Sequence, residues 1–169
     1  MFVCCHTSCN YQPFCIASAI YSGMFDTSLL ISSSDNTRNI TVNIVDSPDT
    51  YPVRYVLPLM QVPWLSVSWQ TNGNTVSDAA IEARAKSGLV KYLNSLSIGQ
   101  DLNILVINRV FIDSISDIIP EEYITSLSIS VSIQTGLSSP VLTQPEAGTQ
   151  IIKSHPEGYW QAISGYITS

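Results

Sequence analysis

The sequence predicts an α+β fold: an antiparallel sheet with a pair of helices packed on one face, plus an extended N-terminal arm. Between residues 76 and 115, apolar residues recur at three- and four-residue steps, as in amphipathic helices. Before and after that stretch they alternate with polar residues, as in strands. The polar partners in the later strand are mostly serines, which indicates a sheet covered on one face only.

The first helix is expected over residues 76–96. Its predicted apolar stripe comprises Val76, Ala80, Ala83, Val90 and Leu93, with Ser87 in the intervening turn. The charged residues Glu82, Arg84, Lys86 and Lys91 fall off the stripe and should meet water. Ser77 or Asp78 can cap the start, because a short side-chain oxygen satisfies free backbone N–H groups there. Gly88 lies inside this helix, where alanine should be neutral or better unless close packing requires glycine.

The second helix is expected over residues 100–115, after a hinge at Ser97–Gly99. Gly99 suits a helix end because glycine tolerates the left-handed conformation. Asp101 would lie in the first turn, where the helix dipole favours a negative charge. The predicted apolar stripe comprises Leu102, Leu105, Val106, Arg109, Val110 and Ile112.

Strands are expected on both sides of the helix pair. The later one presents an apolar face of Tyr123, Thr125, Leu127, Ile129, Val131 and Ile133. Residues 40–70 predict an antiparallel meander that leads through an Asn-Gly turn into the first helix. Pro58 and Pro63 frame one point of it, which should be a sheet edge or a crossing, since proline donates no ladder hydrogen bond.

Residues 135–149 predict a long loop or arm, followed by one or two last strands at Ile151–Ile152 and Tyr159–Ile167. The final segment is rich in aromatic residues. Aromatic side chains supply large contact area at little entropic cost, so Trp160, Tyr166 and Tyr159 are the candidate interface residues. Trp160 and Tyr166 could instead cover the domain's own sheet.

We expect the N-terminal region to form a separate part of the chain, an arm or small subdomain over residues 1–36. An α+β domain should follow over residues 37–169. Four cysteines lie here beside His6, namely Cys4, Cys5, Cys9 and Cys15. Zinc and disulfides are both conceivable, but the spacing matches no paired zinc knuckle and no second cluster follows. We expect reduced, partly buried thiols and no metal.

The charged fraction of 12% is about half the usual value. A free monomer with so few charges is poorly protected against association, which predicts a surface covered by neighbours. The basic residues are scattered, which argues against nucleic-acid binding. No apolar run is long enough to span a bilayer, and no Lys or Arg precedes Arg38, unlike the start of a signal peptide. A secreted β-rich protein with a serine and threonine surface is the alternative.

No constellation of catalytic residues stands out in the sequence. His6 and His155 lie near no carboxylate pair or nucleophile motif, and the glycines form no phosphate-binding loop. Asp113 and Asp117 are four residues apart, but they suit the end of a helix better than acid–base work. We therefore expect no enzyme activity and no cofactor, although an unrecognised site remains a third hypothesis.

One stretch carries a family resemblance, through Tyr92, Leu93, Asn94, Leu96, Ile98, Gly99 and Leu102. A helix ending in this pattern, a second helix, a proline turn and a strand resemble the C-terminal part of the baseplate J-like proteins. The resemblance covers roughly residues 51–134 and departs at Ile119–Glu122, where the family usually has a glycine.

The baseplate J-like proteins are wedge components of phage tails and contractile injection machines. The resemblance implies a wedge-like domain in a structural subunit of a bacteriophage tail baseplate. Such a subunit would be made in the host bacterial cytoplasm and located in the virion. It would contact copies of itself and other tail proteins, and neither nucleic acid nor membrane. A secreted or adhesive β-rich binding module is the alternative function.

Overall fold

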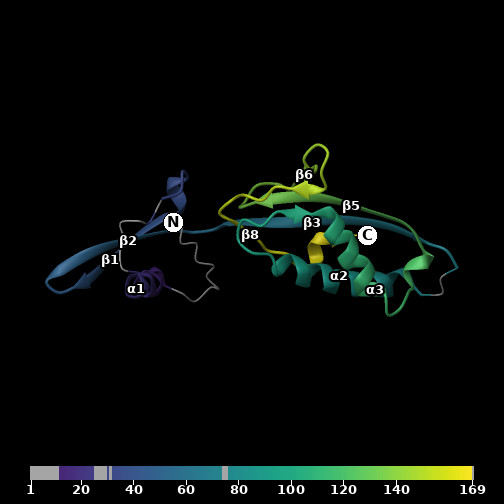
Figure 1. Cartoon of the computed structure of the whole chain (residues 1–169), viewed down its shortest axis with the longest axis horizontal. Coiled ribbons are helices and arrows are strands. Elements are labelled where there is room, and N and C mark those ends of the chain that lie inside the picture. The colour runs from purple at the N-terminus through teal and green to yellow at the C-terminus, as the bar shows by residue number, and fades with distance from the viewer. Residues whose placement is uncertain (1–11, 25–29, 31, 74–75, 169) are drawn as a thin grey trace. The chain divides into compact units, whose positions relative to one another are not determined.

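The computed structural model describes residues 12–24, 30, 32–73 and 76–168 (Figure 1). The chain divides into two compact units, Met1–Pro58 (unit 1) and Leu59–Ser169 (unit 2). The sequence placed a boundary at residue 36, whereas the structure groups residues 37–58 with the N-terminal part. The reason is that the two strands within residues 39–56 share a buried core with a helix of unit 1.

Unit 1 is a helix packed on a two-stranded hairpin. Its elements are α1 (Pro13–Gly23), the 3₁₀ turn η2 (Asn36–Arg38), β1 (Asn39–Asp46) and β2 (Asp49–Val56). Proline at the first turn of α1 suits a position where no backbone N–H is needed. The helix buries Ile16, Ala17 and Ile20 in a cluster that includes Val53 and Tyr55 of β2. An isolated hairpin is marginally stable in water, so this small core holds the unit together.

Unit 2 contains a mixed sheet and two longer helices. Its elements are β3 (Leu59–Thr71), α2 (Asp78–Asn94), β4 (Leu102–Asn103), α3 (Ile104–Ile115), η3 (Glu121–Tyr123), β5 (Ile124–Thr135), β6 (Val141–Thr143), β7 (Ile151–Ile152), β8 (Gly158–Trp160), η4 (Ser164–Tyr166) and β9 (Ile167–Thr168). The sheet order is β6-β5-β3-β8, and β9 also pairs with β3. Both helices lie on one side of the β3–β5 layer, which confirms the predicted α+β class (Figure 1).

The helices exist as predicted, but the faces that they bury differ from the predicted stripes. α2 buries Ile81, Ala85, Leu89 and Leu93, of which only Leu93 belonged to its stripe. α3 buries Ile104, Ile107, Phe111 and Ile115, none of which was in its stripe. In α2 the bulky Ile81 and Leu89 take the core in place of the smaller Ala80 and Ala83, because larger side chains remove more apolar area from water.

The face of α3 is set by how the helix begins. Its first four positions, Ile104–Ile107, are all apolar, so periodicity alone does not choose a face. Leu102 and Asn103 form a short strand instead of the first turn of the helix, and they pair with β7. The Asn103 side chain then accepts a hydrogen bond at 3.0 Å from the Leu105 N–H and caps the helix. This late start directs Ile104 and Ile107 into the core and leaves Leu105 on the surface.

β3 does not continue the β1–β2 hairpin, so the predicted three-strand meander is wrong. β3 pairs antiparallel with β5 from Gln61↔Thr135 to Thr71↔Ile124. Pro58 ends unit 1. On the other edge of β3, the Leu59 N–H donates to Glu157 O and Gln61 O accepts from the Gln161 N–H. Two residues on, Pro63 has no N–H to donate, and it lies where this edge passes from β8 to β9.

The alternation predicted for β5 is confirmed in its central part. Leu127, Ile129 and Ile133 pack against the core of unit 2 and Val131 is buried within it. Residues 135–149 include the short strand β6, which pairs with β5 and becomes the sheet edge. The predicted C-terminal strand is divided into β8 and β9, which run parallel to β3 and are separated by η4.

Candidate functional site

The segment over residues 94–102 runs from the last residue of α2 through the connecting loop to the first residue of β4, and it holds the C-terminal segment of unit 2 in place. We call it the 94–102 loop. At its start, the Asn94 amide donates to Ala162 O at 2.9 Å, and its Oδ1 accepts from the Ala162 N–H at 2.8 Å. One side chain therefore satisfies both backbone groups of a residue that is 68 positions away in sequence. Such two-sided pairing fixes the direction of the bound segment as well as its position.

Gly99 is required in this loop for two reasons. Its φ of 73° lies in the left-handed region, as predicted, which other residues adopt at a cost. A Cβ at this position would also lie 2.6 Å from the Pro156 carbonyl oxygen. The close approach lets the Gly99 N–H donate to Gly158 O at 2.8 Å. α2 itself ends earlier, with Ser95 as its C-cap residue, so Gly99 shapes the loop rather than the helix end.

The last part of the loop binds two further points of the same segment. The Gln100 carbonyl accepts from the Trp160 Nε1–H at 2.7 Å. The Asp101 carboxylate accepts from Lys153 Nζ and from the Ser154 N–H, each at 2.9 Å. The hydrogen bond from Lys153, followed by the one from Ser154, lowers the pKa of Asp101 below its usual value. The stretch that carries the family resemblance thus has a structural role.

The three predicted interface residues occupy different environments. Trp160 is 4% exposed and belongs to the core of unit 2, so its ring is not offered to a partner in this conformation. Tyr166 is half-buried and stacks on Trp64, with ring centroids 4.1 Å apart. Tyr159 is also half-buried. Trp160 therefore covers the sheet of its own domain, which was the alternative considered from the sequence.

A second feature of unit 2 is that its sheet carries no formal charge. The chain has seven basic and thirteen acidic residues, and none of them lies in β3, β5, β6, β8 or β9. The face of β3 and β5 away from the helices is nevertheless exposed. We call this surface the uncharged face; its exposed residues are Ser66, Ser68, Gln70, Ser126, Ser128 and Ser130. Strand register places Ser66 opposite Ser130 and Ser68 opposite Ser128.

The hairpin that leads into β6 exposes apolar side chains beside this face. Leu137 is 103% exposed, Val141 64% and Leu142 60%. No charged residue occurs between Glu122 and Glu146, so nothing in this hairpin opposes association. The candidate interface residues predicted from the sequence lie elsewhere, in the C-terminal segment. The long charge-free run around this hairpin was the signal that could have singled it out.

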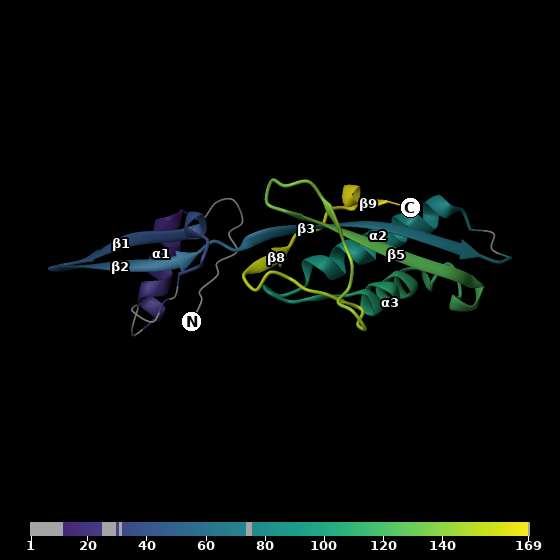
Figure 2. The ribbon, with the colours of Figure 1, turned by 90° about the horizontal axis from the view of Figure 1, so that it is seen from above.

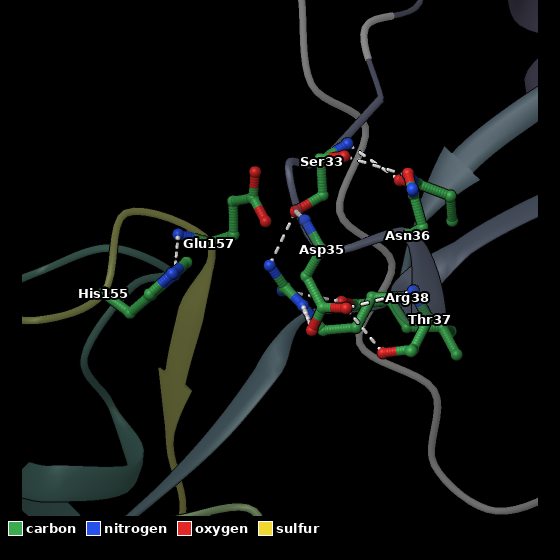
Figure 3. Close-up of polar contacts among 9 residues, drawn as sticks. Ser33, Asp35, Asn36, Thr37, Arg38, His155 and Glu157 are labelled. Atoms are coloured by element: carbon green, nitrogen blue, oxygen red, sulfur yellow. Dashed lines mark hydrogen bonds and ion pairs between the residues drawn. The ribbon is translucent and has the colours of Figure 1, made fainter.

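Unit 1 contains a polar cluster around Asp35 and Arg38 (Figure 3). The Asp35 carboxylate accepts from the Thr37 hydroxyl at 2.6 Å and from the Thr37 N–H at 3.0 Å, and these bonds lower the pKa of Asp35. Arg38 donates to Leu57 O at 3.1 Å and to Ser33 Oγ at 2.8 Å. The cluster joins the start of β1 to the end of β2, so its role is structural.

The candidate catalytic residues of unit 2 also have structural partners. His155 accepts a hydrogen bond at 3.2 Å from the Glu157 N–H through Nδ1, in the turn before β8 (Figure 3). Asp117 forms an ion pair with Arg84 at 3.2 Å, and Asp113 lies 3.9 Å from Arg109. All four of these ion-paired side chains are more than half exposed, so each pair adds little to stability.

Metal-binding and membrane-spanning features can be judged only for the described part of the chain. There, no group of three His, Cys, Asp or Glu residues could hold a metal ion. The candidate ligands Cys4, Cys5, Cys9 and His6 lie outside the described residues. Cys15, on α1, has a free and exposed thiol rather than the partly buried one expected. Across residues 12–24, 30, 32–73 and 76–168, no helix combines the length and apolar character needed to cross a membrane.

Comparison with known proteins adds no assignment. No protein-family model matches this chain, and no curated protein matches it either.

Proposed function

We propose that the chain is a structural subunit of a bacteriophage tail baseplate, of the wedge type, which holds neighbouring subunits in the virion and catalyses no reaction. The observation that supports this most is the exposed, uncharged face of the unit 2 sheet. Neighbours would be copies of this chain and other tail proteins. The sequence resemblance around Asn94 and Gly99 is the reason for proposing the wedge type. The uncharged face is the physical reason for proposing that the chain assembles with other proteins.

An uncharged sheet in a chain of net charge −6 is unusual for a surface that faces only water. Exposed sheets are ordinarily protected by charges that keep two copies apart. Here the strands themselves carry no charge, so another protein that covers them desolvates no ion of these strands, which would be costly. Serine hydroxyls are small and both donate and accept hydrogen bonds, so they suit a flat contact.

The two long strands supply about half of an interface of ordinary dimensions. The 12 residues of β5 span roughly 40 Å, and two strands side by side are about 10 Å wide. The product is roughly 400 Å² per partner, against about 800 Å² for a standard specific interface. The exposed Leu137 and Leu142 of the adjoining hairpin can supply much of the remainder.

The proposal is tested by placing charges on the uncharged face. Mass spectrometry of purified virions from the source of this sequence should detect the chain. The double variant Ser68→Lys, Ser128→Lys should fold, because both side chains are exposed, but should be lost from the particles. The control Thr41→Lys, Asn43→Lys adds the same charge at exposed positions of β1 and should be incorporated normally. Absence of the unaltered chain from virions, or normal particles with the Ser68 and Ser128 variant, would contradict the proposal.

The thiols separate this proposal from a secreted adhesive module. A protein assembled in the bacterial cytoplasm keeps its cysteines reduced, whereas an exported one oxidises them. We expect all four cysteines to react with a thiol reagent after denaturation without reductant. A count of two or none would favour the secreted module, and stoichiometric zinc would overturn the expectation of metal-free thiols.

A further inference from the structure

The end of β3 leads into an Asn-Gly pair, Asn72–Gly73, which occurs nowhere else in the chain. β3 runs beside β5 as far as the pair Thr71↔Ile124, and the Asn-Gly pair follows the end of this ladder (Figure 2). The Asn72 N–H donates to Tyr123 O at 2.9 Å and so ties the end of β3 to the residue before β5. Asn72 and Gly73 are both exposed. The peptide bond between them therefore lies at the surface, outside regular secondary structure.

An Asn-Gly pair can react with itself. The backbone nitrogen of Gly73 attacks the side-chain carbonyl carbon of Asn72, which is already held close to it by the chain. The new bond from nitrogen to carbon replaces the bond to the side-chain nitrogen, which leaves as ammonia with the proton of the Gly73 N–H. Water then opens the cyclic imide at either carbonyl and gives aspartate or isoaspartate. Water is the only co-reactant, and nothing is oxidised or reduced.

Glycine favours this reaction at residue 73. The peptide unit must rotate to bring its nitrogen onto the asparagine side chain, and a Cβ on the following residue hinders that rotation. Gly73 has a φ of 70°, a conformation that glycine adopts without strain. A Cβ at this position would lie 3.8 Å from Tyr123 Cε1, which is an ordinary contact. The described neighbours of Gly73 therefore do not crowd the turn.

The other described asparagines lack this combination. Each precedes a residue with a side chain larger than that of glycine, and they are Asn36, Asn39, Asn43, Asn94, Asn103 and Asn108. Asn94 is the best internal reference, because Ala162 holds both ends of its side-chain amide. The attacking group at this position is also engaged, since the Ser95 N–H donates to Tyr92 O at 3.0 Å. Asn94 must break these bonds before it can react.

We propose that Asn72 is a site of spontaneous deamidation, and that its product loosens the turn end of the β3–β5 ribbon. The reaction replaces a neutral amide by a carboxylate at the end of two strands that carry no charge. Isoaspartate also lengthens the backbone of the turn by a methylene group. A turn that joins paired elements accommodates the extra length by shifting one element against the other.

The surroundings of the new carboxylate are acidic. Asp78 lines the same hollow as Thr71 at this end of the sheet. Glu121 and Glu122 are exposed and directly precede the residue whose carbonyl accepts from Asn72. Like charges repel one another, so the added charge disfavours the closed arrangement of the turn.

The first test follows the chemistry in the purified, folded chain during storage in mildly alkaline buffer. Trypsin releases residues 55–84 as one peptide, because no Lys or Arg lies between Arg54 and Arg84. This peptide should gain about 1 Da, and fragment ions should place the gain at residue 72. Conversion should be at least about tenfold faster than at Asn94, because Asn94 must wait for local opening. An isoaspartyl methyltransferase should label the product.

Two results of this test would overturn the assignment. One is an unchanged residue 72 in the folded chain after a period in which urea-denatured chain converts. The other is equal conversion of Asn72 and Asn94 in the folded chain. Asn72→Gln should abolish labelling of the peptide, whereas Asn74→Gln should leave it unchanged. The opposite pattern would place the reaction at Asn74 and would also overturn the proposal.

The second test measures the loosening. Asn72→Asp supplies the charge without the longer backbone, and it should lower the hydrogen-exchange protection of its own amide about two- to fivefold, as expected for exposed charges. The isoaspartate form should lose more, while amides in the middle of the β3–β5 ladder keep their protection. The matched control Asn43→Asp adds the same charge at an exposed position of β1 and should leave residue 72 unaffected. Unchanged protection of residue 72 in both altered forms would overturn the loosening. None of these measurements depends on whether a baseplate contains the chain.

Discussion

The two units protect their strands in opposite ways. The hairpin of unit 1 carries Asp46 and Asp49 at its turn and Arg54 within β2. The larger sheet of unit 2 carries no charge, although one of its faces is exposed. Both units bury the opposite face beneath helices. The proposed assembly role accounts for this difference: charge is kept where a strand must stay in water and is omitted where the proposal places a partner.

The units also differ in how their tertiary structure is secured. Unit 1 has few buried side chains and adds local polar contacts, such as the Tyr21 hydroxyl, which donates to Asp46 at 2.9 Å. Unit 2 has a larger core, and the 94–102 loop fastens its C-terminal segment over long sequence distances. All three tryptophans, Trp64, Trp69 and Trp160, belong to unit 2. Tryptophan fluorescence therefore follows the unfolding of unit 2 separately from that of unit 1.

The largest effect is expected from Phe111→Ala, in the core of unit 2. Phe111 is 1% exposed and its ring centroid lies 5.7 Å from that of Trp69. Truncating a buried phenylalanine costs about 3–5 kcal/mol, because the lost burial is compounded by a cavity. Urea unfolding followed by tryptophan fluorescence should show this loss, while hydrogen exchange of the β1 and β2 amides should remain unchanged. A matching loss of protection in β1 would show that the units unfold together.

A somewhat smaller effect is expected from Gly99→Val. The substitution adds about 1–2 kcal/mol of left-handed strain, and its Cβ must displace the Pro156 carbonyl, which adds about 1–3 kcal/mol. The midpoint of urea unfolding should fall accordingly. If Gly99→Ala and Gly99→Val both left the midpoint unchanged, the loop would not be the fastening point described here.

The next largest effect is expected from Gly88→Ala, at the glycine inside α2. The substitution is not neutral as helix propensity suggests, because the new Cβ would lie 2.8 Å from Ser114 Cβ and closer still to its Oγ. We expect a loss of about 1–3 kcal/mol from this crowding of α2 against α3. The double variant Gly88→Ala, Ser114→Gly should recover part of the loss, so a double-mutant cycle in urea should show coupling. Purely additive effects would mean that the cost of Gly88→Ala does not arise from contact with Ser114.

A moderate effect is expected from Asn94→Ala, which removes both hydrogen bonds to Ala162. Ala162 is 2% exposed, so its backbone groups lose partners without gaining much water, at a cost of about 1–2 kcal/mol. Hydrogen exchange should accelerate at Ala162 more than in β5. Asn94→Asp is the matched variant, because it keeps the acceptor for the Ala162 N–H and loses the donor. Uniform acceleration across unit 2 would argue against local release of the segment.

The smallest effect concerns pH. The folded state lowers the pKa of Asp101, so the unfolded state binds the proton more tightly. The resulting stabilisation is complete above the unfolded pKa of about 4 and is lost as pH falls further. Asp101→Asn should therefore be less stable than the unaltered protein at pH 7, with the difference disappearing in more acidic solution. A stability difference that persists at pH 2 would assign the role of Asp101 to packing rather than to charge.

The sequence was sufficient for the class of fold and for the positions of its long elements. The helical spacing around Leu93 and the alternation from Leu127 to Ile133 are local patterns in the sequence. In the structure these residues pack in or against the core of unit 2, as the patterns predict. The partners of β3 could not be predicted in the same way. Residues 53–57 and 65–69 have similar alternating patterns, yet β2 pairs with β1 and β3 pairs with a strand some 60 positions later. Pairing over such distances depends on which faces the helices cover, and periodicity does not encode it.

The candidate site was less predictable than the fold. Aromatic content pointed to Trp160 as an anchor, but the same ring is also suited to the core once its Nε1–H finds a backbone partner in Gln100. The motif around Asn94 and Gly99 was visible, whereas its contacts with Ala162 and Gly158 were not, because they involve backbone groups of residues without distinctive side chains.

The 94–102 loop binds residues that are far later in the sequence, such as Ala162, 68 positions after Asn94. This separation affects the order in which unit 2 folds during synthesis. β3 gains β5 once residue 135 has been made, but its other neighbours begin at residue 158. Contacts this far apart in sequence form slowly, since a long loop must close before they give any stabilisation. Until then Gln61 lacks the donors of Ser154 and His155, which lie 93 and 94 positions further on. The ribosome therefore releases the helices and the uncharged β3–β5 ribbon before the segment that completes the sheet, and the nascent chain is most exposed to wrong pairing during that interval.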